Sequence, residues 1–134
     1  VIATLGFLSQ VKNNTKVLKT LEVYFKKYIY DNNIESAYDI TLSIINNVGN
    51  YTTEQLIFLK AVAISDEVLE LSMILKDEKG TFDLSSVPED LRLKATLSFY
   101  SLYNKDEEIN SKLMYLRDNS LDIELRKYLT EILE

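Results

Sequence analysis

The chain contains no cysteine and no histidine, and only three glycines and one proline occur among its 134 residues. The lack of cysteine excludes disulfide bonds and leaves the redox compartment undetermined. Without imidazole and thiol groups, HExxH zinc sites, zinc ribbons, Ser-His-Asp and Cys-His catalytic groups and haem ligation through histidine are excluded. Three isolated glycines cannot form a phosphate-binding loop. We therefore expect no catalytic residue, no metal ligand and no cofactor site in this chain.

The scarcity of glycine and proline also bears on the fold class, because sandwiches and barrels need many turns, which are rich in these residues. Apolar residues make up 46% and charged residues 27% of the chain, as in an ordinary soluble globular domain. A length of 134 residues suffices for one compact core. We expect a single helical domain over residues 1–134. Because the chain starts at Val1 and leads straight into an apolar segment, we also expect it to be a fragment of a longer protein.

The net charge of −6 argues against a general nucleic-acid binder, since phosphate binding needs clustered lysine and arginine. Residues 68–134 hold fourteen acidic against nine basic side chains, so most of the negative charge lies in the second half. No apolar run approaches the roughly 18 residues of a membrane span, and no signal peptide is visible. These features predict a cytoplasmic protein with neither a nucleic acid nor a membrane as its partner.

Apolar residues recur at spacings of three and four, which is the period of an amphipathic helix. This pattern predicts a first helix over 2–11 and a second over about 16–31. Asn32, followed by Glu35, indicates the start of a third helix, and Gly49 its left-handed end. The capping box 52–55 predicts the start of a fourth.

The second half predicts further helices. Residues 65–67 resemble a helix start with acids in the first turn, followed by a helix toward Gly80 and a loop over 81–85. Residues 86–89 read as a capping box with Pro88 in the first turn. Residues 91–99 alternate between apolar and polar side chains, as in a half-buried strand, but the capping box favours a helix. Asn104 with Glu107 predicts the next helix start, and the turn 119–120 precedes the last helix.

The expected fold class is all-α, with seven or eight antiparallel helices joined by short connections. A weak repeat supports a helix-pair array. Asp90-Leu91-Arg92 and Glu124-Leu125-Arg126 lie 34 residues apart, a period typical of helical hairpin repeats. We therefore favour a curved HEAT/ARM-like α-α superhelix over a closed bundle.

Two groups of charged side chains are candidate sites with simpler explanations. Lysines over 12–27, beside three tyrosines, could bind RNA or an acidic partner, but the pattern is also typical of a solvated helix face. The members are Lys12, Lys16, Lys19, Lys26 and Lys27 with Tyr24, Tyr28 and Tyr30. Asp66, Glu67 and Glu70 could hold a metal, but acids in the first turn of a helix explain them better. The same holds for the acids of 106–108. Two glycosylation sequons, at Asn13 and Asn50, are explained by chance.

Two stretches of the chain resemble the C-terminal helical domain of zinc aminopeptidases of the aminopeptidase N and tricorn-interacting-factor type. The first is VIATLGFLSQV, and the second is VLELSMILKDEKGTFDLSSVPEDLRLKATLSFYSLYNKDEEINSKLMYLRDNSLDIELRKYL. Within the second, Asp90-Leu91-Arg92 and the segment 122–126 carry the likeness, each opening a helix after an acidic turn.

The resemblance implies a non-catalytic domain that walls and gates the peptide chamber of a parent metallopeptidase. Zinc and the catalytic residues would lie in the missing catalytic domain, which would be the partner within the same chain and would meet the peptide substrates directly. None of the family's catalytic or metal-binding residues has a counterpart in this sequence. We single out Arg92 and Arg126 as candidate inter-domain or inter-helix contacts. The alternative is a HEAT- or TPR-like adaptor that binds peptides or protein partners.

Overall fold

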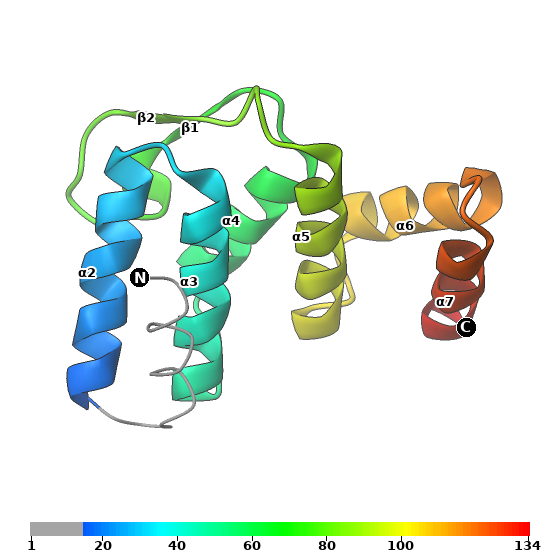
Figure 1. Ribbon diagram of the computed structural model, residues 1–134, viewed down its shortest axis with the longest axis horizontal. Coiled ribbons are helices and arrows are strands. Elements are labelled where there is room, and N and C mark those ends of the chain that lie inside the picture. The colour runs from blue at the N-terminus through cyan, green and yellow to red at the C-terminus, as the bar shows by residue number, and fades with distance from the viewer. Residues whose placement is uncertain (1–14) are drawn as a thin grey trace.

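The computed structural model describes residues 15–134, which form six α-helices and one small two-stranded sheet (Figure 1). The helices are α2 (Thr15–Tyr30), α3 (Ile34–Val48), α4 (Thr53–Ile64), α5 (Glu89–Leu102), α6 (Glu107–Asn119) and α7 (Ile123–Leu133). Between α4 and α5 lie β1 (Val68–Glu70), the short 3-10 helix η1 (Leu71–Met73) and β2 (Thr81–Asp83). The chain is thus mainly helical, as expected, with fewer helices in this part than the sequence predicted. The predicted helix over 2–11 lies outside the described residues.

Consecutive helices pack as pairs, α2 with α3, α4 with α5 and α6 with α7. Figure 1 shows these pairs following one another along the longest axis, so that α2 and α7 lie at opposite ends. Side-chain hydrogen bonds join one pair to the next. The hydroxyls of Tyr38 in α3 and Ser98 in α5 lie 2.6 Å apart, and the Tyr100 hydroxyl donates to the Ile132 carbonyl in α7 over 3.1 Å.

The two predicted ends of α3 had different outcomes. Gly49 ends the helix at φ 83°, the left-handed conformation that glycine adopts without strain, and its N–H donates to the Ile45 carbonyl. At the other end, the N-cap is Asn33 and not Asn32, because Asn32 has a left-handed φ of 51°. The side chain of Asn32 instead bonds both backbone groups of Asp83, accepting from its N–H and donating to its carbonyl.

The predicted helix over 65–80 is wrong, because this segment forms an antiparallel hairpin. Leu69 of β1 pairs with Phe82 of β2, and the Leu71 N–H donates to the Gly80 carbonyl over 2.9 Å. Positive φ angles at Asp77 (64°) and Gly80 (117°) break the helical path. In β2, the side chains alternate between exposed and buried, with Phe82 at 0% exposure. A loop over 81–85 was predicted from the sequence. The alternation of polar and apolar residues over 81–84 has the two-residue period of a strand and was the signal that could have indicated β2.

The helix over 91–99 is confirmed, but two predicted helix starts are wrong. At α5 no side-chain bond forms a capping box, and Pro88 itself is the N-cap. The N-cap of α6 is Asp106 rather than Asn104. The last helix, α7, follows the turn at 119–120 as predicted, with Asp122 as its N-cap. Both aspartates accept a hydrogen bond from the N–H three residues on, as good N-caps do. The capping box that opens α4, with Thr52 and Gln55, is confirmed.

Candidate functional site

Arg92 is a buried cation that joins three segments of the chain. Its side chain is 7% exposed. One terminal nitrogen donates to the Val62 carbonyl in α4 over 3.2 Å, and the other to the Leu84 carbonyl after β2 over 3.0 Å. The second nitrogen also lies 3.1 Å from the carboxylate of Asp66, whose own side chain is 87% exposed. Arg92 therefore contacts α4, the turn after it and the end of the hairpin from its place in α5.

A second cation, Lys112 of α6, binds the same end of α4. Its ammonium donates to the Ala63 carbonyl over 2.6 Å, next to the Val62 carbonyl that accepts from Arg92. The last carbonyls of a helix lack partners within the helix and carry partial negative charge, so two cations stabilise this end. Burial lowers the pKa of Lys112. The C-terminus of α4 is thus the point at which α4, α5 and α6 are held together by polar contacts.

Lys60 forms a third polar link, between α4 and the start of α6. Its ammonium lies 2.8 Å from the Asp106 carboxylate and 3.1 Å from that of Glu108. Asp106 also caps α6 by accepting from the Ile109 N–H over 3.0 Å. Burial raises the pKa of Asp106, but the bonds from Lys60 and the Ile109 N–H outweigh it and lower the pKa overall. The hydrogen bond to Asp106 raises the pKa of Lys60.

Asp106→Asn keeps a capping oxygen but removes the charge that pairs with Lys60, so we expect a loss of about 1 kcal/mol of unfolding free energy at neutral pH. The folded-state pKa of Asp106 lies below its ordinary value of 3.8. The stabilisation is therefore present above 3.8 and is lost as the pH falls through the folded-state pKa. Urea unfolding of both proteins between pH 7 and pH 2 measures this difference. A gap that stays constant over the range contradicts the ion-pair explanation.

The control for this experiment is Asp122→Asn, the same change at the N-cap of α7. Asp122 accepts from the Leu125 N–H over 3.1 Å, and within the described residues no lysine or arginine forms a salt bridge with it. We expect the smaller loss there, because an amide oxygen retains the cap and no ion pair is removed.

Arg126, the other arginine singled out from the sequence, lies apart from this network. Its Nε donates to the Arg117 carbonyl over 3.3 Å, across the connection between α6 and α7. The residue is exposed and borders a shallow depression lined by both charge signs, together with Asp118, Lys127 and Glu131. The structure does not bring Arg92 and Arg126 together. Mixed charges at an exposed surface give no sign of a selective binding site.

Several described members of the lysine and tyrosine group have partners within the chain or are buried. Lys26 and Tyr30 both bond the carboxylate of Glu78, which follows η1 in the chain. Tyr28 is buried, with 9% exposure, and Lys27 lies 5.9 Å from the centre of the Tyr24 ring. These residues fasten α2 to the hairpin segment and fill the edge of the core. Lys12 lies outside the described residues.

The acidic group at 66–70 is not a helix start, so that interpretation is wrong. Asp66 pairs with Arg92 in the turn after α4, and Glu70 lies in β1. Within residues 15–134, no three histidine, cysteine or carboxylate side chains lie close enough to hold a metal ion.

An apolar groove runs along α2 and α3 and over the start of α4. Its volume is about 690 Å³. Most of its surface is apolar, although polar and charged residues stand between and around the apolar ones: Leu18, Glu22, Val23, Phe25, Lys26, Thr41, Ile44, Val48, Asn50, Thr52, Glu54, Gln55, Ile74, Leu75 and Lys76. Val23 is 67% exposed and Val48 is 43% exposed. Val48, the last residue of α3, faces this groove.

Comparison with known proteins yields no relative. No protein-family model, no curated protein and no solved structure matches this chain. Among the described helices, none combines the length and hydropathy that crossing a membrane requires. The polar contacts of Arg92, Lys112 and Lys60 join α4 to α5, to the end of the hairpin and to α6.

Proposed function

We propose that the chain is a non-catalytic helical domain of a zinc aminopeptidase of the aminopeptidase N and tricorn-interacting-factor type. It packs against the catalytic domain of the same chain and walls the peptide chamber. The observation that carries the proposal is the succession of packed helix pairs along the longest axis, with α2 and α7 at opposite ends (Figure 1). A curved HEAT-like wall is the continuation of such a succession. The resemblance of residues 68–129 to the family's helical domain supplies the identity of the parent.

In this role the chain contributes shape and stiffness. The links from Arg92, Lys112 and Lys60 hold the middle helices in fixed relative positions. A stiff wall excludes bulk water from a chamber, which strengthens electrostatic interactions at a distant catalytic centre. Movement of the wall as a unit admits peptides and releases products. Zinc, bound elsewhere, supplies Lewis-acid chemistry to that centre.

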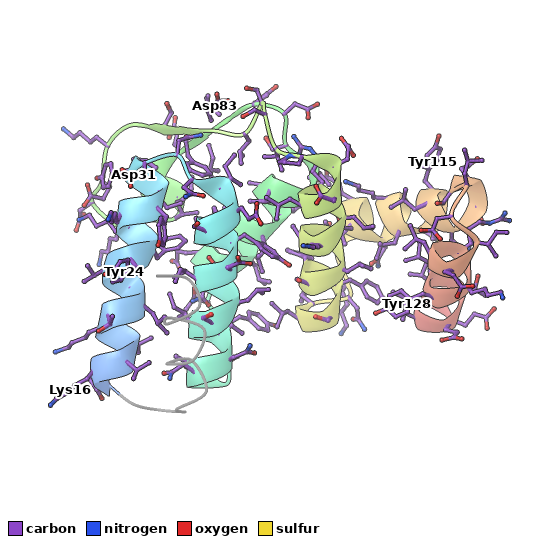
Figure 2. All side chains as sticks on the ribbon, in the orientation of Figure 1. Lys16, Tyr24, Asp31, Asp83, Tyr115 and Tyr128 are labelled. Carbon is purple, nitrogen blue, oxygen red and sulfur yellow. The ribbon has the colours of Figure 1, made fainter. Side chains whose placement is uncertain are left out.

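The last helix pair offers the contact surface for the catalytic domain. Five exposed large apolar side chains come from α6, α7 and their connection: Met114, Tyr115, Leu121, Ile123 and Tyr128. Leu121 is 99% exposed, and burying a leucine side chain is worth about 2 kcal/mol. Figure 2 shows Tyr115 and Tyr128 on this pair, far from Lys16 at the other end of the chain. Contact there leaves the α2–α3 end free to extend over the chamber.

The test begins with the gene. We expect the same reading frame to encode an HExxH sequence upstream of Val1. The encoded catalytic domain and this chain, produced separately, should associate, and Leu121→Asp should weaken the association about tenfold or more. Val68→Asp is the control, because Val68 is 58% exposed on the hairpin, away from α6 and α7. The chain alone, assayed with zinc on aminoacyl fluorogenic substrates, should give no turnover. Turnover by the chain alone, or a frame without HExxH, overturns the proposal.

The apolar groove favours a second candidate, a HEAT- or TPR-like adaptor that holds a partner peptide. This candidate predicts an initiator codon close to Val1. It also predicts that the chain binds an external amphipathic helix and that Val48→Asp raises the Kd of this binding. The aminopeptidase proposal predicts neither result.

A further inference from the structure

The groove along α2 begins where the described chain begins. Leu18, one turn into α2, lines one end of it together with Val48, the last residue of α3. Lys26 of α2 and the residues 74–76 line the other end. Between Leu18 and Lys26 the groove follows eight residues of α2, which is about 12 Å at 1.5 Å per residue.

The residues that precede α2 have the chemistry and length that this groove suits. Residues 1–11 read VIATLGFLSQV and include no charged side chain. Their apolar spacing predicts a helix over 2–11, and ten helical residues extend about 15 Å. Residues 12–14 separate this segment from α2. Three residues reach about 10 Å when extended, which matches the distance between the axes of packed helices.

The groove and the N-terminal segment both carry apolar side chains, so contact of either with water is unfavourable. Val23 and Val48 present apolar surface at 67% and 43% exposure. Six of the first eleven residues have large apolar side chains: Val1, Ile2, Leu5, Phe7, Leu8 and Val11. Mutual burial removes both apolar surfaces from water, and the segment itself brings no charged side chain into the contact.

We propose that this groove is the docking site of the chain's own N-terminal segment, residues 1–11, which lies antiparallel to α2. The docked segment completes the apolar core at the α2–α3 end. The inference does not depend on the aminopeptidase proposal, because it concerns a contact within this chain.

Thiol cross-linking tests the inference, since the natural chain has no cysteine to interfere. The variant Leu8→Cys with Val48→Cys places one thiol in the segment and one in the groove. The matched control combines Leu8→Cys with Asn46→Cys. Asn46 is exposed and lies two residues from Val48, which is about 200° around α3 and therefore on another face. With a short thiol-to-thiol cross-linker, we expect the Val48 pair to link within one molecule at least tenfold faster than the control.

A third variant tests the apolar basis of docking. Adding Leu5→Asp to the Val48 pair should slow cross-linking about tenfold, because docking would bury an unpaired carboxylate. Equal rates for the Val48 and Asn46 pairs overturn the inference, since a segment without a fixed position meets both sites alike. Linked dimers in place of linked monomers overturn it as well, because the occupant would then be a second copy. An unchanged rate in the Leu5→Asp variant also contradicts it.

Discussion

Replacing Arg92 by alanine is expected to lower the free energy of unfolding by about 3 kcal/mol, measured by urea denaturation at neutral pH. The guanidinium is the hydrogen-bond donor for two backbone carbonyls, at Val62 and Leu84, in a side chain only 7% exposed. A buried carbonyl that loses its donor costs about 1–3 kcal/mol, because water cannot replace the bond. The variant loses two such bonds at once.

Two further variants separate the hydrogen bonds from the charge. Asp66→Asn removes the ion pair with Arg92 but should cost less than about 1 kcal/mol, because Asp66 is 87% exposed and surface pairs are weak. Arg92→Lys keeps the charge but not the planar fork that reaches both carbonyls, so an intermediate loss is expected. If Arg92→Ala costs no more than Asp66→Asn, the carbonyl contacts do not stabilise the fold as argued.

The helices were predictable where local signals decide the structure. The capping box of α4 and the left-handed Gly49 act within a few residues, and the sequence is enough to place them. The start of α6 at Asp106 was missed by two residues, because Asn104 and Asp106 are both possible N-caps and only the folded backbone selects one.

The hairpin over 68–83 was not predictable from helical spacing, because the same leucines satisfy that spacing without forming a helix. Phe82 and Leu84 decide the outcome by burial against helices distant in sequence, and both have 0% exposure. Tertiary packing overrides local preference in such a segment.

Among the polar residues, Arg92 was predicted from the sequence to make a structural contact. The backbone carbonyls that accept its hydrogen bonds were not predictable, because every residue has one. Lys60 and Lys112 gave no signal at all, because their partners lie 46 and 49 residues away. The groove was equally hidden. Its lining comes from four separate segments that only the fold brings together.

Phe58→Ala is expected to have the largest effect, a loss of about 4 kcal/mol measured by urea or thermal unfolding. Phe58 has 0% exposure and lies between two other rings, 5.5 Å from Phe25 of α2 in an edge-to-face arrangement and 6.0 Å from Phe82 of β2. Truncation leaves a cavity and removes both ring contacts. Domains of this size have about 5–15 kcal/mol of total stability, so little would remain. Tyr115→Ala, at a 67% exposed position, should change stability by less than about 0.5 kcal/mol.

A second substitution at Phe58 separates the stability of the hairpin from that of the helices. Regular helices keep their hydrogen bonds within themselves, whereas the hairpin has few ladder bonds and depends on Phe82 being held against α4. Phe58→Leu, a milder change, should therefore cost about 1–1.5 kcal/mol overall and speed amide exchange in β1 and β2 more than in the middle of α5. Hydrogen-exchange mass spectrometry resolves the two regions. Uniform acceleration in both would mean that the hairpin opens only with global unfolding, and that Arg92 and the helix caps hold it without the aromatic contact.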